Sequence, residues 1–280
     1  MPAFDAHTHI FAPGQVAARE ALAQRDPTFA ELYSDPAAKL ATGSDLLSEL
    51  DRAGLIGAAA AGFAFASQRD LDEQNAHILE TAAAAPGRVA TLATVNPTVP
   101  GWEGAASAAL SAGARGFGEL RPGNQGWDPL GPESHRLCAL AESAGVPLLW
   151  HVSEPVGHAY PGKGGGLTPA QLIALALDHP GLPMIAAHLG GGASFYLQMP
   201  EIKASLTNLY FDTAAAFLLY DETSITRLVD LAGPDRVLFA SDYPLLSPRR
   251  QLERVQALLP GGLVQAVCGG NAQSLFFGLT

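Results

Sequence analysis

The chain alternates between short apolar runs and longer stretches with helical periodicity, separated by polar, glycine or proline residues. The runs with the length and composition of strands are Ala3–Ile10, Leu55–Ala61, Val89–Val95, Ala114–Leu120, Val146–Val152, Leu182–His188, Leu209–Thr213 and Arg236–Ser241. They are apolar without strict alternation, which is typical of parallel strands covered on both faces. Eight strand–helix units in 280 residues predict an α/β fold, a distorted (β/α)8 TIM barrel, rather than an open doubly wound sheet.

The segments between these runs predict where helices lie. The helical stretches include Ser44–Ala53, Asp70–Ala85, Glu133–Ala144, Pro169–Asp178 and Glu222–Leu231, with Ser44 as an N-cap. Segment 12–43 follows the first strand and predicts a short helical insert that covers the mouth of the barrel. Near the end of the sequence, Asn271 is predicted to be the N-cap of a closing helix. No linker divides the chain, so we expect residues 1–280 to form one barrel domain.

Composition narrows the class of protein. The net charge of −11 opposes general binding to nucleic-acid phosphates. The two cysteines, Cys138 and Cys268, are far apart and form no CxxC pair, which favours a reducing compartment. The N-terminus lacks the basic and apolar regions of a signal peptide, and no run of about 18 apolar residues occurs. We therefore expect a cytoplasmic protein that binds neither nucleic acid nor membrane.

Six ionisable residues fall at the carboxyl ends of the predicted strands. They are His7 and His9 after the first strand, Glu119 after the fourth, His151 after the fifth, His188 after the sixth and Asp242 after the eighth. In a parallel barrel these ends meet at one mouth, where loops follow rigid strands and catalytic groups gather. The sequence therefore predicts that the six side chains form one site.

These residue types suit a divalent metal ion. Neutral imidazoles and carboxylates are good ligands for Zn²⁺ or a similar ion, and an open coordination position holds a water whose pKa falls towards about 7. A carboxylate beside that water can accept its proton. Asp5 precedes the first two histidines and is expected to be buried and to hydrogen-bond its neighbours.

The segments DAHTHIF, LLWHVSE, IAAHLGGG and FASDYP, in this order, resemble the signatures of the amidohydrolase superfamily, in particular its "amidohydrolase 2" group. The resemblance covers almost the whole chain and implies a TIM barrel with one or two divalent metal ions. It implies that His7, His9 and Asp242 bind metal and that His151 is a further ligand. His188 would be a ligand or an acid/base group.

One position departs from many members of the superfamily, in which a carboxylated lysine at the end of the fourth strand bridges two metals. Glu119 occupies this position here, and none of the three lysines falls there. A glutamate at the same point in the TatD-type deoxyribonucleases resembles the bridge. Glu119 is therefore expected to contribute to metal binding.

The resemblance leaves two reaction classes open. The leading expectation is a metal-dependent hydrolase that cleaves an amide, ester, lactone or related bond in a small molecule, with Asp242 taking the proton of the water and His188 assisting. The alternative is a non-oxidative metal-dependent decarboxylase of an anionic small molecule, because the same group includes such enzymes. In that case His188 would handle protons and Glu119 would be a neighbour of the metal site or a substrate contact.

Cationic and polar residues near the site predict how an anionic substrate is held. These are Arg121, two residues after Glu119, and His158, Tyr160 and Lys163 in the Gly- and Pro-rich loop after the fifth strand. The expected partner is thus a small-molecule substrate. The resemblance also allows a homodimer.

Overall fold

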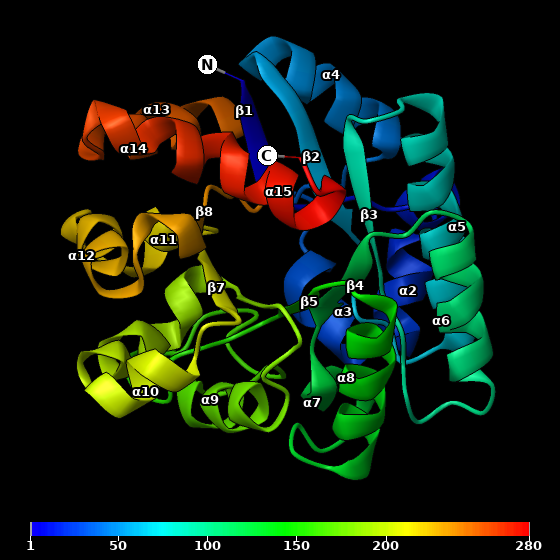
Figure 1. The fold of residues 1–280 in the computed structure, drawn as a ribbon. Coiled ribbons are helices and arrows are strands. Elements are labelled where there is room, and N and C mark those ends of the chain that lie inside the picture. The colour runs from blue at the N-terminus through cyan, green and yellow to red at the C-terminus, as the bar shows by residue number, and fades with distance from the viewer. Residues whose placement is uncertain (1, 280) are drawn as a thin grey trace.

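The computed structural model describes residues 2–279 and contains one eight-stranded parallel sheet in the order β1 to β8 (Figure 1). The strands are β1 (Ala3–His9), β2 (Leu55–Ala61), β3 (Val89–Ala93), β4 (Gly116–Leu120), β5 (Leu148–Trp150), β6 (Met184–Ala186), β7 (Leu209–Asp212) and β8 (Val237–Leu238). Each lies within a run predicted from the sequence, so the predicted TIM barrel is confirmed. Most of the strands are shorter than the predicted runs, at one end or at both.

Backbone hydrogen bonds between the first and last strands close the barrel. The amide of Ala6 donates to the carbonyl oxygen of Phe239 at 2.8 Å, and the amide of Asp242 donates to that of His7 at 3.1 Å. A further isolated parallel bridge joins Thr8 to Tyr243. This irregular closure places the first and last predicted metal ligands side by side.

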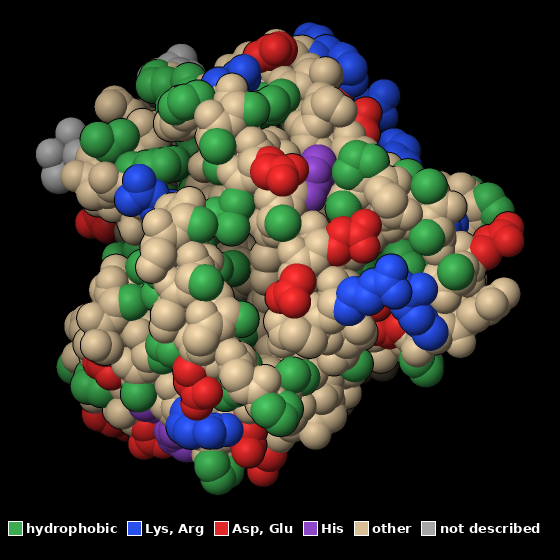
Figure 2. All heavy atoms as spheres, turned by 90° about the vertical axis from the view of Figure 1, so that its right-hand side faces the viewer, with side chains coloured by type: hydrophobic (Ala, Val, Ile, Leu, Met, Phe, Trp, Pro, Cys, Tyr) green, Lys and Arg blue, Asp and Glu red, His purple; other side chains and the backbone are tan. Residues whose placement is uncertain are grey.

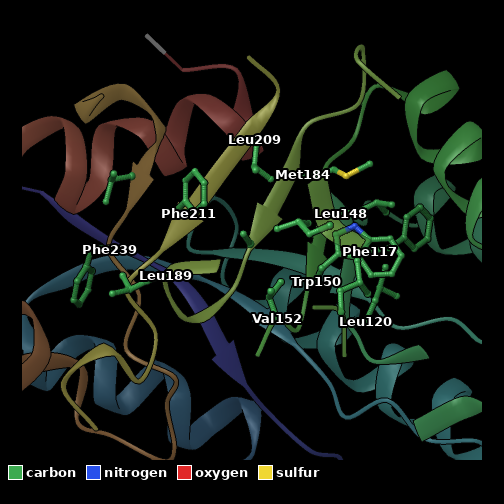
Figure 3. Close-up of a cluster of buried hydrophobic side chains, with 14 of the residues drawn as sticks. Phe117, Leu120, Leu148, Trp150, Val152, Met184, Leu189, Leu209, Phe211 and Phe239 are labelled. Atoms are coloured by element: carbon green, nitrogen blue, oxygen red, sulfur yellow. The ribbon is translucent and has the colours of Figure 1, made fainter. Parts of the chain in front are cut away.

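Two hydrophobic layers hold the strands. The outer layer joins strand residues such as Phe117, Trp150 and Phe211 to the surrounding helices (Figure 3). The inner layer is built from alternate strand residues, including Leu149 and Leu238, and the final helix closes it. Burial on both faces is the reason that the strand sequences are apolar without alternation.

Helices surround the strands on the outside (Figure 1). They are α4 (Gly43–Ala53), α5 (Gln68–Ala84), α6 (Trp102–Ser111), α7 (Pro122–Gln125), α8 (Pro132–Ala144), α9 (Pro169–Asp178), α10 (Pro200–Ser205), α11 (Ala216–Leu219), α12 (Thr223–Ala232), α13 (Pro248–Leu258), α14 (Gly261–Gln265) and α15 (Asn271–Phe277). The short helical turns are η1 (His188–Gln198), η2 (Pro234–Arg236) and η3 (Ala266–Gly270).

The segment after β1 forms the predicted helical cover. It contains α1 (Pro13–Ala17), α2 (Arg19–Arg25) and α3 (Pro27–Tyr33). Its apolar side chains pack with Phe63 and Phe65, which follow β2, in a small aromatic cluster separate from the two barrel layers. The cover is therefore fixed to the barrel mouth by a core of its own.

Two predicted helix caps are wrong. The N-cap of α4 is Thr42, whose Oγ1 accepts a hydrogen bond from the amide of Asp45, so Ser44 lies inside the helix. Asn271 is not an N-cap, because the chain is already helical through η3 when it reaches this residue. The Asn271 side chain instead donates to the carbonyl oxygens of Pro234 and Val237 and ties α15 to β8.

Surface and hydropathy features bear on the predicted partners. On the face shown in Figure 2, basic side chains form several separate groups interleaved with acidic ones, so this face has no broad positive surface. Among residues 2–279, no helix combines the length and apolar content that crossing a bilayer requires. The cytoplasmic location stays a prediction.

Candidate metal centre

The carboxyl ends of the strands bring the six predicted residues together in two groups. Within each group the potential ligand atoms lie within 4.8 Å of one another. The first group is His7, His9 and Asp242, and the second is Glu119, His151 and His188. All except His7 line a cavity of about 410 Å³ at the barrel mouth, and His7 is fully buried.

The first group has the donor arrangement that a cation requires. His7 Nδ1 donates to Asp212 Oδ2 at 2.8 Å, and His9 Nδ1 donates to the carbonyl oxygen of Gly62 at 3.2 Å. In the neutral rings, with the proton on each Nδ1, both Nε2 atoms can present lone pairs to an ion, and these atoms lie 3.0 Å apart. The Asp242 carboxylate is 3.5 Å from His9 Nε2. Two lone pairs and a carboxylate that face one another fit a shared divalent ion.

The second group is centred on a buried carboxylate. Glu119 Oε1 lies 2.8 Å from His151 Nδ1 and 3.5 Å from His188 Nε2. The same carboxylate lies 3.8 Å from His7 Nε2 through Oε1 and 3.8 Å from His9 Nε2 through Oε2. Glu119 therefore lies between the two groups.

Burial lowers the pKa values of the histidines, and the charges of the nearby carboxylates raise them. Burial alone would lower the pKa of His7, but the charges of Asp212 and Glu119 reverse this effect and raise the pKa to about 10. Burial and the neighbouring His7 lower the pKa of His9. Burial lowers the pKa of His151 to about 4 despite the charge of Glu119. The neighbouring carboxylates thus make this a negative centre that favours a bound cation.

Unusual backbone angles direct two of the side chains. His188 has φ of 58° and Asp242 has φ of 63°, in the left-handed region that residues other than glycine rarely adopt. Asp212 Oδ1 accepts from the amide of His188 at 2.9 Å, and the carbonyl oxygen of His7 accepts from the amide of Asp242 at 3.1 Å. These contacts hold both strained residues where their side chains meet the other ligands.

Asp212 is a residue that the sequence analysis missed. Its carboxylate, fully buried at the end of β7, accepts from His7 Nδ1 and from the amides of His188 and Ala214. The available signal was its position near the carboxyl end of the seventh predicted strand, Leu209–Thr213, to which no site residue was assigned. Asp5 behaves as predicted: its Oδ1 accepts from the amides of His7 and Ser241 at 3.2 and 2.9 Å.

Comparison of the sequence with protein families gives a match to a family model described as Amidohydrolase, over residues 4–278. The chain belongs to this family. No curated protein matches the sequence. The match over nearly the whole chain confirms the resemblance carried by the four histidine and aspartate motifs.

Solved structures with the same fold include several decarboxylases. The amidohydrolase-family chain is 18% identical to a 5-carboxyvanillate decarboxylase from Sphingomonas paucimobilis, with a TM-score of 0.79 and coverage of 100% of this chain and 99% of that one. It is 16% identical to a 2,6-dihydroxybenzoate decarboxylase in complex with 2,6-dihydroxybenzoate, with a TM-score of 0.75 and coverage of 99% of each chain. A dihydroxybenzoic acid decarboxylase from Polaromonas sp. JS666, with bound manganese and the inhibitor 2-nitroresorcinol, is 15% identical, with a TM-score of 0.70 and coverage of 98% and 96%. At these identities the likeness shows a shared fold.

Three of the four residues predicted to hold an anionic substrate line the cavity, and the fourth, Lys163, does not. Arg121, His158 and Tyr160 line the cavity. Arg121 is 5% exposed and donates to the carbonyl oxygens of Gly162 and Gly164, while its Nε has no partner among the described residues. Lys163 lies outside the cavity lining, and its ammonium donates to the carbonyl oxygens of Val156 and His158 within its own loop. Contact of these residues with substrate stays a prediction.

Asp212→Asn is expected to lower divalent-metal affinity by about 10- to 100-fold, because the side chain that orients His7 loses its charge. The amide can still occupy the same volume, so the barrel should remain folded. Titration of the metal-free protein with Mn²⁺ or Zn²⁺ measures the change. Unchanged affinity would show that Asp212 only supports the backbone of His188.

Proposed function

We propose that the protein is a decarboxylase that uses a divalent metal ion and acts on an aromatic acid or a similar planar, anionic small molecule. The observation that carries this proposal is the composition of the cavity. Apolar side chains including Leu32, Phe63 and Leu218 line it together with members of both ligand groups. The buried cation of Arg121 has no carboxylate partner among residues 2–279. Such a cavity suits a flat apolar ring that carries a negative group. The substrates named for decarboxylases of the same fold support this choice.

His7, His9 and Asp242 would hold the ion, and His151, the further ligand that the family resemblance implies, belongs to the neighbouring group with Glu119 and His188. When bound there, a divalent ion acts as a Lewis acid that withdraws electron density from a substrate oxygen. Imidazole and carboxylate donors suit both Zn²⁺, which the sequence suggests, and Mn²⁺, which is bound in a decarboxylase of the same fold.

His188 has the geometry of a proton donor. In decarboxylation the bond from the substrate carbon to the carboxylate breaks, its electron pair stays on the carbon, and that carbon takes up a proton as CO2 leaves. His188 Nδ1 is 3.1 Å from the carbonyl oxygen of Ala214 and donates to it, which leaves Nε2 facing the cavity. Burial opposes protonation, but Glu119 and Asp242 raise the pKa of His188 to about 9, so the site can keep a proton there at neutral pH.

The function is tested by supplying metal-loaded protein with hydroxylated benzoates and measuring CO2 release. We expect release with Mn²⁺ or Zn²⁺ and none after treatment with a chelator. A parallel series of aryl esters, lactones and amides measures hydrolysis. Cleavage of that series without CO2 release from any benzoate would contradict the proposal.

Hydrolysis is the second candidate function, and the position of Glu119 supports it. A carboxylate between two ligand groups can be shared by two cations about 3.5–4 Å apart, as in two-metal hydrolytic sites. In that case the cleaved bond would be an amide, ester, lactone or related bond. Asp242 would accept the proton of the attacking water, and His188 would polarise the substrate or assist the leaving group.

A further inference from the structure

Tyr33, the last residue of α3, brings the cover segment into the cavity. Its ring packs against Phe11, Phe29 and Phe63, with ring centroids 5.3, 4.9 and 5.9 Å away. Phe11 and Phe63 meet it edge to face. These contacts fix the direction of the ring, so the position of its hydroxyl is set before any ligand binds.

The Tyr33 hydroxyl has no hydrogen-bond partner among residues 2–279. Two other tyrosines near the mouth differ, because Tyr160 and Tyr220 both donate to Glu154. Tyr33 lines the same cavity as Asp242, Arg121 and Glu119, so its side chain borders the space next to the metal centre. With no acceptor among the described residues, this half-buried O–H can donate to a molecule bound in the cavity.

The hydroxyl is a donor throughout the neutral pH range. Burial raises the pKa of Tyr33, the charge of Asp242 raises it further, and Arg121 offsets only part of the increase. A neutral phenol can donate one hydrogen bond, and the carboxylates nearby are the ones expected to bind metal. When a substrate fills the cavity, one of its oxygens can take the place of water as the acceptor.

We infer that the Tyr33 hydroxyl donates a hydrogen bond to an oxygen substituent on the ring of the substrate, so that the cover segment selects oxygenated aromatic acids over unsubstituted ones. The inference deepens the proposed function and rests on its assignment of an aromatic acid to the cavity. Tyr33 is then a specificity-determining residue. It needs no part in the transfer of the proton or in breaking the bond.

The test compares ligand binding by the Mn²⁺-loaded wild type and by Tyr33→Phe, which keeps the ring contacts and removes only the oxygen. The probes for calorimetric titration are benzoate, its 2-, 3- and 4-hydroxy derivatives, and 2,6-dihydroxybenzoate. For at least one hydroxylated probe we expect Tyr33→Phe to weaken binding by about tenfold. Benzoate should bind both proteins equally. Tyr196→Phe, on an exposed tyrosine outside the cavity lining, is the matched control and should change neither.

A purely structural role for Tyr33 would weaken all probes alike, benzoate included, and would overturn the inference. Equal binding of every hydroxylated probe to the wild type and Tyr33→Phe would also overturn it, as would the absence of binding of all probes to the wild type. Failure of the proposed function has a different signature. In that case the tenfold difference appears in the titrations, but no probe releases CO2.

Discussion

Asp242→Asn is expected to weaken divalent-metal binding by at least about a hundredfold and to reduce product formation below detection. Asn tolerates the left-handed backbone angle of this residue, φ of 63°, so the substitution leaves the turn after β8 intact. It removes the negative charge 3.5 Å from His9 Nε2. The paired lone pairs of His7 and His9 then lack the anion that offsets the charge of an ion. Metal analysis after dialysis, together with the activity assay, measures both effects.

Asp178→Asn is the matched control, because Asp178 is exposed at the end of α9 and its side chain forms no ion pair or hydrogen bond with other residues among 2–279. It should keep full metal content and activity. The position of Asp242 in the metal centre would be contradicted if Asp242→Asn also bound metal with wild-type affinity. Equal thermal stability of the two variants would show that the loss in Asp242→Asn is local.

The barrel could be predicted from the sequence because a strand that is buried on both faces is a continuous run of apolar residues. Even β8, only Val237–Leu238, lies in the apolar run that ends before Asp242. The site could be predicted from the polar residues at the ends of these strands, since the carboxyl ends of the strands converge in any parallel barrel. Asp212 was not predicted as a site residue, because a lone aspartate near the end of an apolar run has no recognisable spacing to a partner. Its role depends on a contact with His7, 205 residues away in the sequence.

The substrate side of the cavity was less predictable. Lys163 was expected to face the substrate, but the turn of its loop brings the carbonyl oxygens of Val156 and His158 to its ammonium. Tyr33 was not singled out, because its place at the mouth depends on how the cover packs against Phe63. The place of Tyr33 depends on a contact between distant segments, and that of the Lys163 ammonium on the turn of its own loop. Neither can be read from a local sequence pattern.

Glu119→Gln is expected to leave one divalent ion per chain and to lower CO2 release by at least about a hundredfold. The charge of Glu119 supports protonation of His188, whose Nε2 lies 3.5 Å away. A neutral amide removes that support, so the pKa of His188 falls. Since a proton donor loses its proton as pH rises through its pKa, CO2 release by the variant should decline at a lower pH than in the wild type. Metal analysis and a pH–rate profile measure the two effects.

The same variant separates the two candidate functions. If Glu119 is shared by two ions, the wild type should bind two per chain when metal is in excess, and Glu119→Gln should bind fewer and lose ester or lactone hydrolysis together. Glu201→Gln, on an exposed glutamate of α10, is the control and should match the wild type in metal count and rate. A fall in metal count confined to Glu119→Gln would refute the one-ion decarboxylase. An unchanged count with a shifted pH profile would support it, because the carboxylate then acts on His188 and holds no metal.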